Sequence, residues 1–172
     1  TGTGEDRSVD FGSTAQGQMV RVPNVEWLNQ LTRSGDVITV SFWQKLRSTG
    51  ASYAFWAVTP TRERAISAHA PWSDNVIYWD TGGAGAGTRV SINSTDFETE
   101  FSWTNWNHIV LVKNEFIKQI WVNGVFRTEG DASVPLVSDI VDFGIGNHPT
   151  AAPTATSGAI KGWIDDFAIF AG

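Results

Sequence analysis

The sequence predicts an all-β protein, and three observations carry that prediction. Apolar and polar residues alternate with period two along most segments rich in β-branched and aromatic residues. The chain has 17 glycines and only 17% charged residues, a composition that suits strands joined by many turns. Only Val25 to Arg33 has helical spacing. A length of 172 residues is typical of one domain with a substantial core, so we expect residues 1–172 to form a single domain.

The clearest strand runs from Ile38 to Leu46. Ile38, Val40 and Phe42 would share one face with Leu46, while the residues between them would point to the opposite face. This pattern is typical of a strand with one face packed on a core.

A meander is expected in the centre of the chain. His108 to Lys113 is a nearly continuous apolar run, which predicts a strand buried on both faces. Lys118 to Val122 follows as a second strand. The pair Asn123-Gly124 is a strong signal for a two-residue hairpin turn, with Val125 to Thr128 as the return strand.

Further strands are expected on either side of this meander. Val141 to Gly146 and Ala159 to Phe170 have strand patterns, and the segment from Pro149 to Gly158 between them has the composition of a loop. Earlier in the chain, Asn75 to Asp80 predicts a short strand and Thr81 to Thr88 a glycine-rich loop.

The charge and composition argue against several classes of partner. The net charge is -6 with a pI near 4.9, so we expect no nucleic acid, because phosphate contacts need clusters of Lys and Arg. The absence of cysteine excludes disulfides, thiolate metal sites and cysteine nucleophiles. No run approaches the roughly 20 apolar residues of a membrane span, so we expect no membrane insertion.

Five segments carry motifs that can be compared with a known superfamily. They are ITVSFW at 38–43, WNHIVLVK at 106–113, IWVNG at 120–124, FGIGN at 143–147 and GWIDDFAIF at 162–170. Their order and spacing across residues 8 to 172 resemble the laminin-G-like domains of the concanavalin A-like lectin and glucanase superfamily. The resemblance implies a two-sheet antiparallel β-sandwich of the concanavalin A-like jelly-roll type.

Catalysis is the first function to weigh, because glycosidases and lyases occur on the jelly roll that this resemblance implies. Retaining hydrolysis needs two carboxylates about 5 Å apart. The hydrolases of this superfamily carry an E-x-D-x-x-E type motif, which this chain lacks. Asp96, Glu98 and Glu100 could alternate onto one face of a strand, but a solvated edge or loop is the simpler interpretation. We therefore expect a protein that is not an enzyme.

The resemblance also implies one structural calcium ion beside the last strand. Asp165 and Asp166 match the family's pair of carboxylates, and Gly12 lies in the matching N-terminal segment. Phe11 stands where the family has an aspartate, which removes one expected ligand. The alternative is that Asp165 and Asp166 accept hydrogen bonds from loop amides.

Ligand binding by aromatic residues is the third possibility. Sugars stack their C–H faces on aromatic rings and bind polar side chains through their hydroxyls. His69, Trp72, Asp74 and Trp79 offer that mixture within one loop and strand, so they are the candidate ligand-binding residues. Alternatively, Trp72 folds back as a lid on one end of the sandwich.

Two functions follow from these observations. The first is a non-catalytic, lectin-like carbohydrate-binding module on a secreted, cell-surface or virion protein. The second is a structural or adhesive module that binds a surface protein, such as a capsid decoration or fibre domain, in a homo-oligomer or larger assembly. The second function gains support from Ile66 to Asp74, which resembles a subgroup of these domains in bacterial surface and phage proteins.

Overall fold

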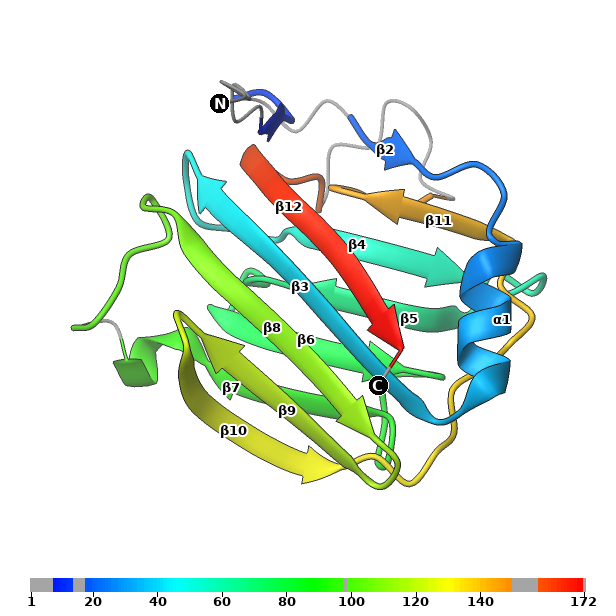
Figure 1. The fold of residues 1–172 in the computed structure, drawn as a ribbon. Coiled ribbons are helices and arrows are strands. Elements are labelled where there is room, and N and C mark those ends of the chain that lie inside the picture. The colour runs from blue at the N-terminus through cyan, green and yellow to red at the C-terminus, as the bar shows by residue number, and fades with distance from the viewer. Residues whose placement is uncertain (1–7, 14–17, 98, 150–157, 172) are drawn as a thin grey trace, which may run out of the picture.

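Two antiparallel sheets, each of six strands, pack face to face as a jelly-roll β-sandwich (Figure 1). This computed structural model describes residues 8–13, 18–97, 99–149 and 158–171, and the elements below belong to that part of the chain. Sheet A has the order β1 (Val9–Asp10), β12 (Gly162–Ala171), β3 (Val37–Leu46), β8 (Asn107–Asn114), β9 (Ile117–Val122) and β10 (Val125–Asp131). Sheet B has the order β2 (Val20–Arg21), β11 (Asp142–Ile145), β4 (Tyr53–Val58), β5 (Arg64–His69), β6 (Val76–Thr81) and β7 (Arg89–Asn93). The predicted two-sheet sandwich is confirmed.

The core between the sheets follows from the alternation in β3. Ile38, Val40 and Phe42 are fully buried, and Leu46 at the end of the strand is nearly so. The ring of Phe42 meets Phe55 of sheet B edge to face, with centroids 6.1 Å apart. The face predicted to point inward is therefore the one that joins the two sheets.

Strand β8 differs from the prediction of burial on both faces. Ile109 and Leu111 are fully buried, but Val110 and Val112 lie on the outer face and are only partly covered. Lys113 also points inward and is fully buried, and its ammonium group donates to Asp36 at 2.6 Å. The run is apolar because the outer face carries valines, not because another layer covers it.

The hairpin between β9 and β10 forms as predicted. Asn123 has φ 53° and Gly124 has φ 76°, the two positive values that a type I′ turn requires. A β-carbon costs energy in this region of φ, which explains the Asn-Gly pair.

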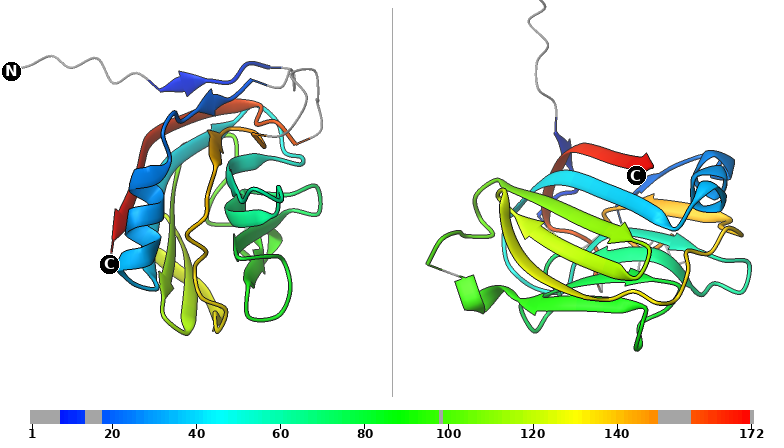
Figure 2. Two further views of the ribbon diagram at one scale, coloured as in Figure 1. Left: turned by 90° about the vertical axis from the view of Figure 1, so that its right-hand side faces the viewer. Right: turned by 60° about the horizontal axis from the view of Figure 1, so that its bottom comes forward.

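The predicted helix is α1 (Glu26–Ser34), which covers one side of the sandwich next to the segment leading into β11 (Figure 2). The Asn29 amide donates to the carbonyl of Ile140 at 2.9 Å and accepts from its N–H at 2.8 Å. This pair of bonds ties the helix to the chain between β10 and β11. In the described part of the chain no helix is long and apolar enough to cross a bilayer.

Strands β4, β5 and β7 were not predicted. Five of the six residues in both β4 and β5 are buried, so the apolar–polar alternation that marks a half-buried strand is weak there. The loop predicted from Pro149 to Gly158 falls mostly on residues 150–157, outside the described residues.

Candidate ligand-binding site

The outer face of sheet B carries a row of polar and aromatic side chains across four strands. Tyr53 of β4 pairs with His69 of β5, His69 with Tyr78 of β6, and Tyr78 with Ser91 of β7. The register places their side chains on the same face, because strand side chains alternate between faces. The opposite face of these strands supplies the core.

This row forms the floor of a pocket of about 310 Å³. Its lining residues come from the outer face and from the β5–β6 loop: they are Tyr53, Arg64, His69, Trp72, Asp74, Tyr78 and Arg89. Three aromatic rings, two guanidinium groups, an imidazole and a carboxylate therefore meet at one hollow.

Trp72 stands in the β5–β6 loop and forms one wall of the pocket. Its N–H donates to Val76 at 2.8 Å, and its carbonyl accepts from Asn75 at 3.0 Å, so the turn holds its backbone. Its ring centroid lies 4.4 Å from that of His69 and 5.4 Å from that of Tyr53. The indole is half-buried against these rings and still lines the pocket.

Asp74 and Tyr78 form a polar edge. The Tyr78 hydroxyl donates to Asp74 Oδ2 at 2.6 Å, and the Val76 N–H donates to Asp74 Oδ1 at 3.1 Å. The hydrogen bond to Asp74 raises the pKa of Tyr78, so this phenol stays protonated at neutral pH. Both partners are fixed and still reachable from solvent.

Two arginines share one buried carboxylate beneath the pocket. Asp80 of β6 is fully buried, and it accepts from Arg64 and from Arg89, the latter at 2.6 and 2.8 Å. The Arg64 guanidinium lies 4.2 Å from the ring centroid of Trp56, and that of Arg89 lies 4.2 Å from Tyr78. Ring stacking and the shared carboxylate hold both guanidiniums in place.

His69 is the most buried side chain of the pocket, with 4% of its surface exposed. Burial, followed by the nearby Arg64 charge, lowers the pKa of His69 to about 4, so the imidazole is neutral at pH 7. Its Nδ1 lies 3.3 Å from the carbonyl of Ser52, which can only accept. Nδ1 therefore carries the proton, and Nε2 remains an acceptor.

Three of the four residues proposed from the sequence meet at this pocket, namely His69, Trp72 and Asp74. Trp79 does not. It is fully buried on the inner face of β6, and its indole N–H donates to the Val112 carbonyl at 3.1 Å. This placement corrects the prediction: Tyr78, its neighbour on the other face, takes the place assigned to Trp79.

Tyr53, Arg64 and Arg89 were missed because they lie on β4, β5 and β7, which the sequence did not reveal as strands. For Tyr78 a signal existed, since it alternates with the core residues Ile77 and Trp79.

The proposed calcium ligands do not all lie together. Val9 pairs with Ile164 and Asp10 with Trp163, a register that places Gly12 four positions from the partner of Asp165. That offset is roughly 13 Å along the strand, too far for one ion with ligands at about 2.4 Å. The Gly12 carbonyl instead accepts from the Arg47 guanidinium at 3.2 Å. Gly12 is therefore removed from the predicted calcium site.

Asp165 and Asp166 lie at a bulge in β12, and Asp165 Oδ1 accepts from the Asp166 N–H at 2.9 Å. This amide belongs to the strand itself, so the alternative of loop amides bonded to both carboxylates stays a prediction. Within residues 8–13, 18–97, 99–149 and 158–171, no group of three or more His, Cys, Asp or Glu side chains could hold a metal ion. Calcium binding by Asp165 and Asp166 stays a prediction.

Of the acidic residues weighed for catalysis, the two that the structure describes, Asp96 and Glu100, do not lie on a strand. Asp96 lies on the short 3₁₀ helix η1 (Ser94–Phe97), and Glu100 lies in the turn region that follows. Glu100 pairs with Arg127 at 2.5 Å, while Glu98 lies outside the described residues.

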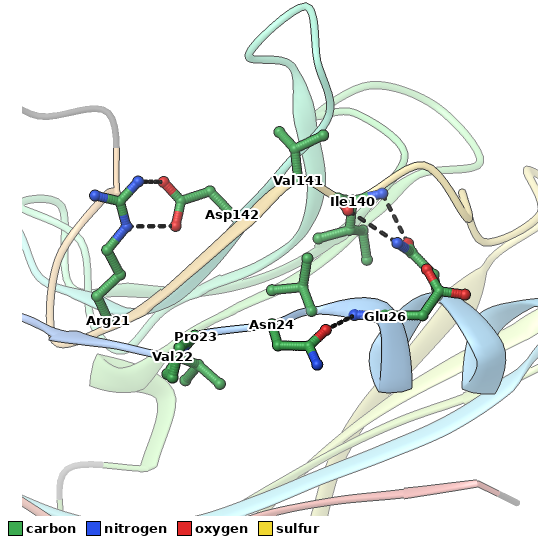
Figure 3. A pocket seen from close by; sticks show the side chains of 10 residues that line it. Arg21, Val22, Pro23, Asn24, Glu26, Ile140, Val141 and Asp142 are labelled. Atoms are coloured by element: carbon green, nitrogen blue, oxygen red, sulfur yellow. Dashed lines mark hydrogen bonds and ion pairs between the residues drawn. The ribbon is translucent and has the colours of Figure 1, made fainter.

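A larger pocket, of about 550 Å³, lies between α1 and the segment leading into β11 (Figure 3). Its polar groups are already paired: Arg21 binds Asp142 through two hydrogen bonds, and Asn29 binds the Ile140 backbone. Since no aromatic side chain lines this pocket, the sheet B pocket is the better candidate for ligand binding.

No protein-family model matches this sequence, and no curated protein matches it either. Solved structures do share its fold. The CBM40 domain of the Ruminococcus gnavus IT-sialidase, solved with α2,3-sialyllactose, has a TM-score of 0.70 at 9% identity, over 96% of this chain and 90% of that one. Domain 4 of an extracellular arabinanase from Geobacillus stearothermophilus, solved with arabinotriose, has a TM-score of 0.60 at 18% identity, over 98% and 76%.

A pentraxin from Limulus polyphemus is also similar, with a TM-score of 0.55 at 15% identity, over 78% of this chain and 63% of that one. At these low identities the similarity establishes only a common fold, the jelly-roll β-sandwich. Two of the three similar structures were solved with a bound glycan.

Proposed function

We propose that this chain is a carbohydrate-binding module that holds a glycan in the sheet B pocket. The observation that carries the proposal is the arrangement of Tyr53, Trp72 and Tyr78 around polar groups within one hollow. Aromatic faces stack on the C–H faces of sugars, while fixed donors and acceptors bind sugar hydroxyls. The Asp74 carboxylate and the acceptor Nε2 of His69 supply two such polar groups.

The comparisons support this proposal. Two of the similar structures were solved with oligosaccharides, one with sialyllactose and one with arabinotriose. Both likenesses cover nearly the whole of this chain, so the fold that holds those sugars is the fold seen here.

The module is proposed to bind without catalysis, as part of a secreted, cell-surface or virion protein. Retaining hydrolysis uses a carboxylate nucleophile and a carboxylic acid about 5 Å apart. Of the two carboxylates near the pocket, Asp80 is fully buried between two guanidiniums, and Asp74 is held by the Tyr78 hydroxyl. Asp80 is placed as a counter-ion of the arginines rather than as a group that reaches a sugar.

The test is a glycan array followed by calorimetry on the Trp72→Ala variant. We expect the variant to bind the best glycan at least about tenfold more weakly, because it loses a stacked ring. Trp106→Ala is the matched control, since Trp106 is 39% exposed and precedes β8 of the other sheet. Absence of glycan binding by the unaltered chain, or equal losses in both variants, would refute the proposal.

A second candidate function, adhesion or assembly, is favoured by the outer face of sheet A. Trp43, Phe126 and Phe170 are 39%, 43% and 52% exposed there. Trp43 stacks on His108 with centroids 5.0 Å apart, and Trp121 meets Phe126 at 5.3 Å. Exposed apolar patches of this kind mark protein contacts. Sedimentation analysis at high concentration tests this function, and a strict monomer without a surface partner counts against it.

A further inference from the structure

We propose that the sheet B pocket selects glycans bearing a carboxylate, which binds the guanidinium N–H groups of Arg64 and Arg89 that Asp80 does not use. This inference rests on the proposed function and names the ligand class of the same site. It follows from the charges beneath the pocket, the hydrogen bonds left unmade there, and the polar edge formed by Asp74 and Tyr78.

The base of the pocket has two positive charges and one buried negative charge. Asp80 is the carboxylate that Arg64 and Arg89 share, and its side chain is fully buried. The side chains of Arg64 and Arg89 are 19% and 27% exposed, and both line the pocket. Asp80 thus balances one of the two guanidinium charges at the base. The carboxylate of Asp74, which lines the pocket, lies at the exposed edge, where water weakens its attraction for Arg89.

The unused hydrogen-bond donors point to the same ligand. Arg64 bonds Asp80 through Nη1, and Arg89 does so through Nε and Nη2. Among the described residues, Nε and Nη2 of Arg64 and Nη1 of Arg89 have no hydrogen-bond partner. Guanidinium N–H groups match the two oxygens of a carboxylate, and such charge-assisted bonds are about twice as strong as neutral ones.

The guanidiniums are already in position for an anion. Arg64 stacks on Trp56 and Arg89 stacks on Tyr78, each at 4.2 Å. Because the shared carboxylate and the rings fix both side chains, a ligand need not order them on binding. Burial lowers the pKa of Arg64, and the attraction of Asp80 outweighs the repulsion from Arg89 that acts on it.

Asp74 makes the pocket selective for a sugar rather than for any anion. Its oxygens accept from Tyr78 and from the Val76 N–H, and it remains exposed to solvent. A carboxylate oxygen can accept more than one bond, so Asp74 can also accept from a sugar hydroxyl. A ligand with a carboxylate at one end and hydroxyls at the other satisfies both the arginines and Asp74.

The test measures binding of matched sugars by calorimetry. The probes are sialyllactose against lactose, an oligogalacturonate against its methyl ester, and a sulfated galactose oligomer. We expect each free acid to bind at least about tenfold more tightly than its neutral counterpart, with the preference shrinking as salt is raised. The sulfated sugar is expected to bind more weakly than the carboxylates, because its single charge is spread over three oxygens, each of which accepts hydrogen bonds less strongly than a carboxylate oxygen.

The variants Arg89→Gln and Arg89→Lys locate the effect. Arg89→Gln should abolish the preference for the acid, so that the variant binds an acidic sugar and its neutral counterpart equally. Arg89→Lys keeps the positive charge that balances Asp80, so it is the variant less prone to misfold. It lacks the planar guanidinium donors, so it should lose most of the preference for the acidic sugar. Arg21→Gln is the control, because Arg21 pairs with Asp142 outside this pocket. Thermal unfolding checks that every variant is folded.

The possible results separate the two proposals. Equal binding of acidic and neutral sugars, lost in Trp72→Ala, overturns the carboxylate inference and keeps the proposed function. Failure to bind any sugar overturns the proposed function itself. Sulfated and carboxylated sugars that bind equally well, both dependent on Arg89, overturn the selectivity for carboxylates.

Discussion

His69 belongs to the packing of sheet B and to the proposed site at once. Its ring is nearly buried and lies within 6 Å of the rings of Tyr53, Trp72 and Tyr78. A charged imidazole would be buried away from water and next to the positive charge of Arg64, so the neutral form is favoured. The residue therefore serves as a neutral acceptor and as the platform against which Trp72 rests.

The titration of His69 can be measured directly. The folded pKa of about 4 lies below the ordinary value of 6.5, so in this interval the unfolded state binds a proton that the folded state does not. The contribution of His69 to stability is thus present above pH 6.5 and is lost as the pH falls towards 4.

NMR of the imidazole should show His69 neutral at pH 6, with a midpoint near pH 4. Glycan affinity should accordingly be the same at pH 6 and at pH 8. A midpoint close to the ordinary value would mean that the ring is solvated and does not support Trp72 as described.

Among the secondary-structure elements, those with a strong local signal were predicted and those buried throughout were not. The alternation in β3 and the Asn123-Gly124 turn identified sheet A. Period-two alternation indicates a half-buried strand, and an Asn-Gly pair indicates a hairpin turn. Strands β4 and β5 gave no such signal, since tertiary burial covers nearly all of their residues. For this reason Trp72 and Asp74, which lie in a loop of mixed composition, were predicted, whereas Arg64 and Tyr53 were not.

Helix α1 is attached by apolar packing of Leu28 and by the hydrogen bonds of Asn29 to the segment before β11. Replacement of Asn29 by Ala would leave the N–H and the carbonyl of Ile140 without their partners in a buried position. We expect a loss of about 2–4 kcal/mol, the cost of two buried polar groups left unsatisfied. Urea unfolding measures this loss, with Gln30→Ala, an exposed position on the same helix, as control. Equal midpoints for the two variants would show that the attachment does not stabilise the fold.

In the whole molecule, a buried lysine connects the two sheets. Lys118 of β9 is fully buried, and its ammonium group donates to the carbonyls of Trp79 and Thr88 on the side of sheet B. It also lies 5.3 Å from the ring centroid of Trp79. A charge at this depth is costly unless it is paired, and burial lowers the pKa of Lys118 to about 7.

Stability should therefore respond to alkaline pH. Between about pH 7 and the ordinary value of 10.5, the unfolded chain keeps a proton on Lys118 that the folded chain has lost. The free energy of unfolding should gain a positive slope approaching about 1.4 kcal/mol per pH unit from this group. Comparison of urea unfolding for the unaltered chain and Lys118→Met from pH 7 to 10 isolates the effect. Parallel pH dependences would show that Lys118 titrates normally.

Side chains of strands β4 to β7 point alternately to the two faces of sheet B, which has a consequence for diversifying the outer surface by mutation. Phe55, Ala68 and Trp79 hold the sandwich together on one face, while Tyr53, His69 and Tyr78 stand across from them on the other. The outward positions that are at least partly exposed, such as Tyr53, Tyr78 and Ser91, can thus be exchanged for other side chains while the inward ones keep the scaffold. A combinatorial library confined to the outward positions would sample new recognition surfaces on an unchanged architecture.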